Sequence, residues 1–178
     1  RTYYYEFFPS NKLELGLWLE SERMLHPVID EIGVKTQNEV VKEEKRLSYD
    51  NRPYGQLLPQ ITQSLFKKHP YRWLPIGSMD HLDSATLDEF IAYNKKFYVP
   101  NNAVLVVAGN FEIDETKNKI KDYFGPIPRG NDVPRIDIEE DPLTAEIRKS
   151  FYDPNIQLPM GLVCYRIPSF KERDSYVL

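Results

Sequence analysis

The stretch that decides how this chain is interpreted is Gln37-Asn-Glu-Val-Val-Lys-Glu-Glu-Lys-Arg46, most of which is charged, as is typical of a surface helix. Successive side chains of an α-helix are about 100° apart, which places Glu44 within about 60° of an apolar stripe. A carboxylate that points into a buried apolar face must be paired, protonated or bound to a cation, because an isolated buried charge is too costly. Glu44 is therefore a candidate functional residue. The stripe consists of Val40, Val41 and Leu47.

Two interpretations of Glu44 follow from this geometry. In the first, its side chain lies at the edge of the stripe and either extends into solvent or pairs with Lys45 or Arg46. In the second, Glu44 is a metal ligand or a catalytic carboxylate, and Gln37, two turns earlier on the same face, helps to orient the site. The neighbouring Glu43 points away from the stripe. Periodicity alone does not separate the two interpretations.

The composition is that of a folded protein without nucleic-acid-binding character. The chain has 178 residues, of which 41% are hydrophobic and 28% charged, enough for one domain or for one domain and part of another. Its net charge of -4 and its lack of a basic stripe argue against nucleic acid as a partner. The longest apolar run, residues 103–108, is far shorter than the ~20 residues that cross a bilayer. Cys164 is the only cysteine, and we expect it to be a small buried hydrophobe.

Local signals predict helices alternating with short strands. The clearest signal is in residues 84–98, where apolar side chains recur with helical spacing and Thr86-x-x-Glu89 resembles a capping box. Residues 127–143, which are rich in proline, glycine and acids and have no period, predict an extended linker, assigned to residues 131–145. Helices are predicted over residues 10–24, 33–48, 54–68, 84–98 and 114–124, and strands over residues 2–8, 103–108, 147–152 and 158–167.

The three histidines do not form a metal-binding motif. His26, His69 and His81 each lie beside a turn residue, and we expect them to be surface or turn residues. The chain contains no His-x-x-x-His, Cys-x-x-Cys or Gly-x-Ser-x-Gly motif. These residues therefore do not supply a complete zinc site or a serine-hydrolase nucleophile by themselves.

The chain resembles a known family over most of its length. The run Glu39–Arg46, followed by Asp50-Asn-x-Pro-Tyr-Gly55, is similar to the zinc metallopeptidases of the insulinase (pitrilysin) family, which includes mitochondrial processing peptidase. Further matches occur in the same order along about residues 1–130, which makes the resemblance far more specific than a single motif. They are Leu13-Glu-Leu-Gly-Leu-Trp18 with Arg23-Met24, His69-Pro-Tyr-Arg-Trp73, Ile76-Gly-Ser78, Phe97-Tyr-x-Pro-Asn-Asn-Ala103, Val106-Val-Ala-Gly-Asn110 and Tyr123-Phe-Gly-x-Ile-Pro128.

The resemblance implies an α+β fold in which a mainly antiparallel sheet is covered by helices. It implies that residues 1–130 are the C-terminal part of an insulinase-like peptidase domain, that residues 131–145 are a linker, and that residues 146–178 begin the next repeat. The His-x-x-Glu-His motif of the family precedes the part that corresponds to residues 2–8. We therefore expect this chain to start after the motif and to hold an incomplete domain.

The resemblance also selects Glu44 over Glu43. In this family, His-x-x-Glu-His supplies two zinc ligands and the general base, and a downstream glutamate supplies the third ligand. Glu44 corresponds to that third ligand, whereas Gln37 replaces a carboxylate that commonly supports the site. An amide forms hydrogen bonds but carries no charge. We therefore expect zinc in the parent protein but not in this chain, which holds no catalytic residue of its own.

The implied activity of the parent protein is hydrolysis of peptide bonds, in which zinc polarises the carbonyl and activates a water molecule. Its partners would be peptides or unfolded polypeptides, and the 178-residue chain alone is expected to be inactive. The alternatives are a non-catalytic scaffold or partner subunit of the same family, which the amide of Gln37 favours, and an unrelated binding module. Open sheet edges would promote self-association. Family members from cells without organelles are often in the cell envelope, the compartment that the resemblance suggests.

Overall fold

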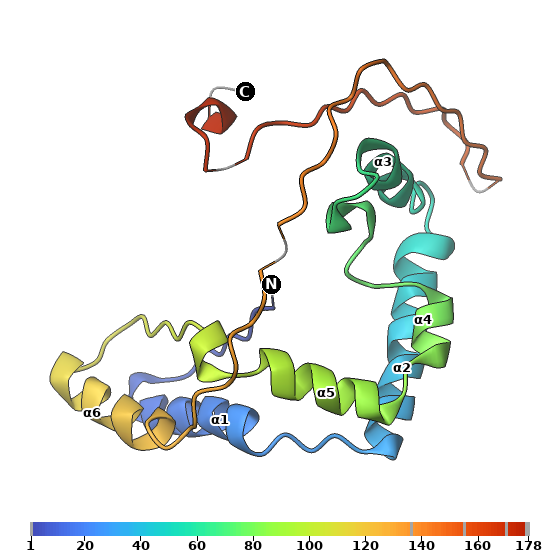
Figure 1. Cartoon of the computed structure of the whole chain (residues 1–178). Helices are drawn as coiled ribbons and strands as arrows, with labels where there is room; N and C mark the ends of the chain where they lie inside the picture. The colour runs from blue at the N-terminus through green and yellow to red at the C-terminus, as the bar shows by residue number, and fades with distance from the viewer. Residues whose placement is uncertain (1, 136, 155, 170, 177–178) are drawn as a thin grey trace. The chain divides into compact units, whose positions relative to one another are not determined.

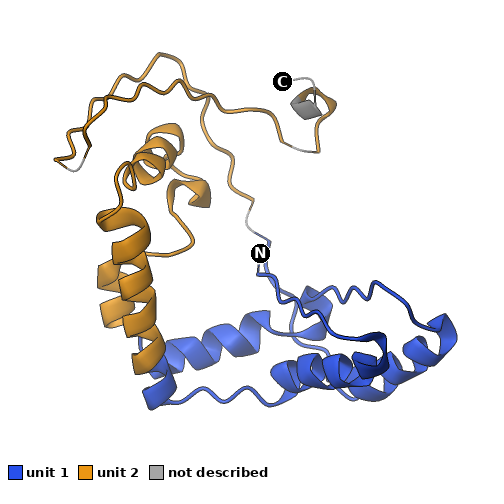
Figure 2. Cartoon of the chain, turned by 180° about the vertical axis from the view of Figure 1, so that it is seen from behind, with its two compact units in different colours: residues 1–34, 85–135 blue, residues 35–84, 136–178 orange. Residues whose placement is uncertain are grey.

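The chain folds into two compact units made of helices and extended segments (Figures 1 and 2). The computed structural model describes residues 2–135, 137–154, 156–169 and 171–176. The first unit comprises residues 1–34 and 85–135, and the second comprises residues 35–84 and 136–178. The α-helices are α1 (Leu13–Leu25), α2 (Glu31–Lys45), α3 (Leu57–Leu65), α4 (Met79–Ser84), α5 (Leu87–Phe97) and α6 (Ile113–Phe124), joined by the short helical turns η1 (Ser10–Lys12), η2 (Arg46–Asp50), η3 (Pro70–Arg72), η4 (Pro100–Asn102) and η5 (Arg173–Tyr176).

The expected α+β fold is wrong for this structure, because no strand forms among the residues just given. None of the segments predicted as strands contains a helix, and none forms a backbone strand pair with another segment. These segments are residues 2–8, 103–108, 147–152 and 158–167. A strand must pair its N–H and C=O groups with a second strand, and β-branched residues in one segment do not provide that partner. Val104 and Val106 are accordingly 89% and 78% exposed. Cys164, in the last of these segments, is exposed rather than buried.

The core of the first unit lies around α1, which packs against α6. Leu17 and Val99 are the only apolar side chains classed as buried in the described part of the chain. Gly16 allows the ring of Phe8 to lie directly against α1, since a Cβ at this glycine would be 2.4 Å from the ring. Gly130 approaches Val99 in the same way. The core is therefore small, and it depends on close contacts at glycine.

Helix α5 begins where the sequence predicts a capping box. The hydroxyl of Thr86 accepts a hydrogen bond from the N–H of Glu89 at 3.4 Å, and the carboxylate of Glu89 accepts one from the N–H of Thr86 at 2.8 Å. The bond from the Thr86 backbone is the main reason why the pKa of Glu89 is lowered. Each side chain satisfies an N–H group that the helix itself leaves unpaired. The predicted helix over residues 84–98 is thus confirmed, with Thr86 as its N-cap.

The other predicted helices form with different lengths. Residues 10–24 become η1 and α1, residues 33–48 become α2 and η2, and residues 54–68 keep a helix only over α3. Helix α6 ends before Gly125-Pro126 as predicted. Helix α4 was not predicted, because six residues are too few to show a helical period.

No helix in the described part of the chain is long and apolar enough to span a membrane. The predicted domain bounds, 1–130, 131–145 and 146–178, stay a prediction.

Replacement of Leu17 by alanine should destabilise the first unit. Leu17 is 3% exposed, and removing a buried leucine side chain costs about 2–5 kcal/mol of unfolding free energy. Leu15, on the same helix, is 51% exposed and gives a matched control, Leu15→Ala, with an effect within about 0.5 kcal/mol. Urea unfolding followed by circular dichroism measures both. Equal losses for the two variants would show that Leu17 is not a core residue.

Candidate functional site

Helix α2 is attached through one side to α4 in the second unit (Figures 1 and 2). The side-chain amide of Asn38 donates a hydrogen bond to the carbonyl of Leu82 at 3.0 Å, and Lys42 forms an ion pair with Asp83. The hydrogen bond with Asp83 is the main reason why the pKa of Lys42 is raised. At 3.6 residues per turn, Asn38 and Lys42 lie about 120° and 160° around the helix from Glu44. The contacts with α4 therefore leave the side that carries Glu44 uncovered.

Glu44 is exposed, and it forms no hydrogen bond or ion pair with any residue that the structure describes. Both neighbouring cations have other partners. Lys45 Nζ lies 3.0 Å from Asp50 Oδ1, and Arg46 Nη1 lies 3.1 Å from Glu43 Oε2. Of the two forms of the simpler interpretation of Glu44, the ion pair with Lys45 or Arg46 does not form, whereas a side chain that extends into solvent agrees with the structure. Its carboxylate is available to a ligand from outside the described residues.

The apolar stripe around Glu44 lies at the surface. Val40 and Leu47 are 53% and 63% exposed, and Gln37 is exposed on the same side. Val41, which is turned toward the α4 side, is half-buried. The expectation that Glu44 points into a buried apolar face is therefore wrong. A solvated carboxylate needs no buried partner, so the exposure of Glu44 removes the cost that the buried arrangement would carry.

A π-helical segment follows Glu44 almost directly. Residues Arg46–Asp50 form this segment, and the N–H of Asn51 donates to the carbonyl of Arg46 at 2.8 Å. π-Helical turns are rare, and they occur frequently at functional sites. Sequence reasoning missed this element, because an apolar period of 3.6 has no signature for one extra residue in a turn. The π segment thus places a rare backbone geometry directly after the helix that carries Glu44.

The motif Asp50-Asn-x-Pro-Tyr-Gly55 folds back onto the π segment. Tyr54 has a φ of +62°, which is uncommon for a residue other than glycine. A Cβ at Gly55 would lie 2.2 Å from the carbonyl oxygen of Tyr49, so only glycine fits there without a shift of the backbone. Gln56 Nε2 donates to the carboxylate of Asp50 at 2.9 Å. The motif thus forms a tight turn after the π segment, held by the contacts of Gly55 with Tyr49 and of Asp50 with Gln56.

The described residues do not make a zinc site by themselves. They contain no group of three or more His, Cys, Asp or Glu side chains that could hold a metal ion. Zinc in proteins takes three or four protein ligands, and Glu44 supplies one. The histidines are surface or turn residues, as predicted. His26 Nδ1 lies 2.7 Å from Glu22 Oε2, His69 Nδ1 accepts the N–H of Tyr71, and His81 is exposed on α4.

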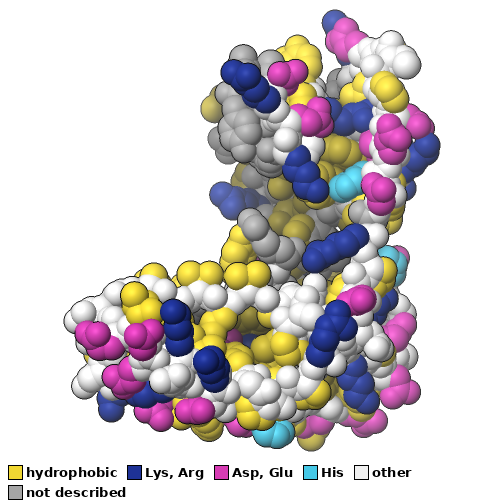
Figure 3. Space-filling model, turned by 60° about the vertical axis from the view of Figure 1, so that its left-hand side comes forward, with side chains coloured by type: hydrophobic (Ala, Val, Ile, Leu, Met, Phe, Trp, Pro, Cys, Tyr) yellow, Lys and Arg dark blue, Asp and Glu magenta, His cyan; other side chains and the backbone are white. Residues whose placement is uncertain are grey.

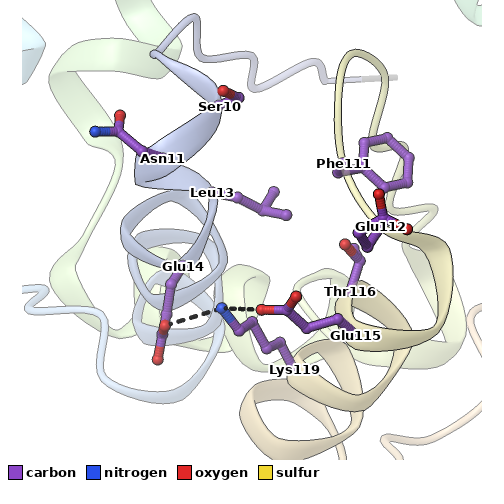
Figure 4. A pocket seen from close by; sticks show the side chains of 9 residues that line it. All are labelled: Ser10, Asn11, Leu13, Glu14, Phe111, Glu112, Glu115, Thr116 and Lys119. Carbon is purple, nitrogen blue, oxygen red and sulfur yellow. Dashed lines mark ion pairs between the residues drawn. The ribbon is translucent and has the colours of Figure 1, made fainter.

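A second polar cluster lines a cavity of about 210 Å³ beside α1 and α6 in the first unit (Figure 4). Lys119 Nζ lies 3.2 Å from Glu14 Oε2 and 3.0 Å from Glu115 Oε1. The hydroxyl of Tyr123 donates to Glu14 at 3.0 Å, and this bond is the main reason why the pKa of Glu14 is lowered. The ion pairs of Lys119 and the bond from Tyr123 link α1 to α6. We therefore interpret the cluster as structural.

The family of the chain follows from comparison with known proteins. A protein-family profile described as "Peptidase M16 inactive domain" matches residues 84–178, which is more than half of the chain. The chain belongs to the M16 peptidase family. This is the insulinase-type family that the motifs of the sequence indicated, so that resemblance is confirmed.

Several M16 relatives are zinc proteases by name. The zinc protease PqqE of Helicobacter pylori is 26% identical over 93% of this chain and 38% of its own length. An uncharacterized zinc protease of Mycobacterium leprae is 28% identical over 70% of this chain and 28% of its own length. A crystal structure of a protease from Helicobacter pylori matches with a TM-score of 0.70 and 28% identity, over 74% of this chain and 32% of that one. The chain spans about a third of the length of these relatives.

Replacement of Gly55 by alanine should displace the turn that closes α2. The added methyl group would lie 2.2 Å from a backbone oxygen, and relieving such a clash costs about 1–3 kcal/mol of unfolding free energy. Gly161→Ala in the same unit is the control, because a Cβ there meets no atom within 4 Å. Thermal unfolding of both variants measures the difference. An equally small effect of the two substitutions would contradict the close approach of Gly55 to Tyr49.

Proposed function

We propose that this chain supplies one zinc ligand, the carboxylate of Glu44, to the site of an M16 zinc protease that hydrolyses peptides or unfolded polypeptides. The observation that carries the proposal is the lack of a partner for Glu44 within the described residues, although Lys45 and Arg46 are adjacent and charged. A carboxylate oxygen is one of the ligands that zinc takes in proteins. The names of the relatives as zinc proteases support the same assignment.

The surroundings of Glu44 suit a ligand that has to be held in position. On one side, Asn38 and Lys42 fix α2 against α4. At the C-terminal end of α2, the π segment and the turn at Gly55 fix the end of the helix. The backbone of Glu44 is thus ordered before any ligand binds, and the entropy lost on binding is mainly that of its own side chain.

Gln37 would have a supporting role in this site. It lies seven residues before Glu44, which is about 10 Å along the helix axis and on the same face. At that spacing its amide would reach a water molecule or a ligand donated by another segment rather than Glu44 itself. It can donate and accept hydrogen bonds there, but it adds no charge to the site.

In this proposal, the 178-residue chain by itself does not hydrolyse peptides. Bound zinc would polarise a peptide carbonyl and lower the pKa of a water molecule. Those functions require two further ligands and a general base, which the resemblance assigns to a His-x-x-Glu-His motif that these residues do not contain. The remaining groups would have to come from another part of a longer M16 protein or from a partner chain.

A non-catalytic scaffold or partner subunit is the second candidate function. Two observations favour it: the matching family profile is described as an inactive domain, and Gln37 is an amide where the family commonly has a carboxylate. The two candidates differ in what the protein that contains this chain binds. A zinc protease holds zinc at Glu44, whereas a scaffold retains its fold and its partner without zinc.

Replacement of Glu44 by glutamine should abolish the zinc site in an M16 protein that joins this chain to a His-x-x-Glu-His segment. The amide keeps the shape of the side chain but not its charge, and we expect zinc affinity and peptidase activity to fall by at least about 100-fold. Glu43→Gln is the matched control, because Glu43 forms an exposed ion pair with Arg46, and such pairs contribute little. Zinc content by atomic absorption and cleavage of a fluorogenic peptide measure both effects.

The same measurements separate the two candidate functions. Unchanged zinc content in the Glu44→Gln protein would remove Glu44 from the site. Stoichiometric zinc and peptide cleavage by the 178-residue chain alone would overturn the proposal that its site is incomplete. A joined protein with Glu44 intact but without zinc or activity would favour the scaffold.

We also expect this chain to self-associate in isolation. Large apolar side chains are visible over much of the face in Figure 3, and Phe7 is 94% exposed. Exposed apolar side chains beside unpaired extended backbone promote association between copies. Multi-angle light scattering should therefore give a mass above the 21.0 kDa of one chain, and Val104→Lys with Val106→Lys should lower it. A monomer at micromolar concentration would contradict this expectation.

A further inference from the structure

The carboxylate of Glu140 fills a cluster of backbone N–H groups in the turn that follows α3. Glu140 Oε1 accepts a hydrogen bond from the N–H of Lys67 at 2.8 Å. Glu140 Oε2 accepts two more, from the N–H groups of Lys68 at 2.8 Å and His69 at 2.7 Å. Three successive N–H groups that converge on one carboxylate form an anion-binding nest. The nest and its occupant both belong to the second unit, although more than 70 residues separate them in the sequence.

Charged side chains around this nest strengthen the attachment of the segment around Glu140 to the turn after α3. Lys68 Nζ forms an ion pair with Asp141 at 2.7 Å, and Arg166 Nη1 donates to the carbonyl of Asp141 at 2.7 Å. The guanidinium of Arg166 also lies 5.8 Å from the centre of the Phe66 ring. His69 Nδ1 accepts a hydrogen bond from the N–H of Tyr71 at 3.2 Å. Charged or titratable side chains near Glu140 include Lys67, Lys68, His69, Glu139, Asp141, Arg166 and Arg72, whose Nη1 donates to the carbonyl of Lys67 at 2.8 Å.

We propose that Glu140 is a charge-dependent latch, whose carboxylate occupies the nest of residues 67–69 and fastens residues 139–141 to the turn after α3 within the second unit. These residues lie within the segment that the sequence predicts as a linker, and its apolar side chains Ile138 and Leu143 are 39% and 41% exposed. The three hydrogen bonds to Glu140 are the contacts of this attachment that need its carboxylate to be ionised, and the ion pair of Lys68 with Asp141 adds to them. The latch does not involve Glu44, so it is independent of the proposed zinc site.

The latch stays closed at neutral and mildly acidic pH. The hydrogen bond from His69 is the main reason why the pKa of Glu140 is lowered from its ordinary value of 4.5 to about 2. A carboxyl group whose pKa is lower in the folded state stabilises that state above its ordinary pKa. This contribution is lost as the pH falls from about 4.5 through about 2. The turn should therefore hold residues 139–141 across the physiological pH range.

Replacement of Glu140 by glutamine should open the latch at pH 7. A neutral amide oxygen accepts fewer and weaker bonds than a carboxylate, so we expect hydrogen exchange at the amides of Lys67, Lys68 and His69 to become roughly tenfold faster. Glu139→Gln is the matched control, because it removes the neighbouring charge and leaves the nest occupied. The amide of Phe90, bonded to Thr86 in the first unit, reports whether the variant remains folded.

A titration of the wild-type chain gives an independent test. The carboxyl carbon resonance of Glu140 should titrate with a midpoint near 2, and the amide protons of residues 67–69 should shift over the same range. Glu140→Asp, which keeps the charge on a shorter side chain, should exchange at an intermediate rate. The proposal is overturned if Glu140 titrates at its ordinary value, or if Glu139→Gln accelerates exchange as much as Glu140→Gln.

Discussion

The attachment of α2 through a single side is the constraint on which the candidate site depends. Asn38 and Lys42 turn one side of the helix toward α4. The opposite side, with Val40, Glu44 and Leu47, is thereby turned to solvent. A helix anchored by its polar side chains exposes its apolar ones, which reverses the usual arrangement of a surface helix. The exposed apolar side chains and the unpaired carboxylate therefore have the same structural cause.

The parts of the fold that follow from local chemistry were predictable from the sequence. The capping box of Thr86 and Glu89 sets the start of α5, and Gly125-Pro126 sets the end of α6, because both signals act within one turn of backbone. The strands were not predictable in this way. Residues 103–108 have the composition of a buried strand, but a strand also needs a partner, and nothing within six residues specifies one.

The candidate site shows the same limit of local reasoning. The helical period places Glu44 beside Val40 and Leu47, and the family motif selects it over Glu43. Whether that stripe is buried depends on α4, a six-residue helix that has no periodic signal of its own. The partners that Lys45 and Arg46 adopt depend on side-chain geometry at Asp50 and Glu43. The position of Glu44 was thus predictable, whereas the choice between an exposed side chain, an ion pair and a buried ligand was not.

The π segment after α2 changes the phase of the helix. Each of its hydrogen bonds spans five residues instead of four, so successive side chains advance by less than 100° around the axis. Side chains beyond Lys45 therefore lag behind the positions that a regular helix would give them. Removal of one residue between 46 and 50 would restore the regular phase and rotate the turn at Gly55, while Glu44 would keep its place. Relatives whose π segment is longer or shorter by one residue would thus share the Glu44 position and present different surfaces next to it.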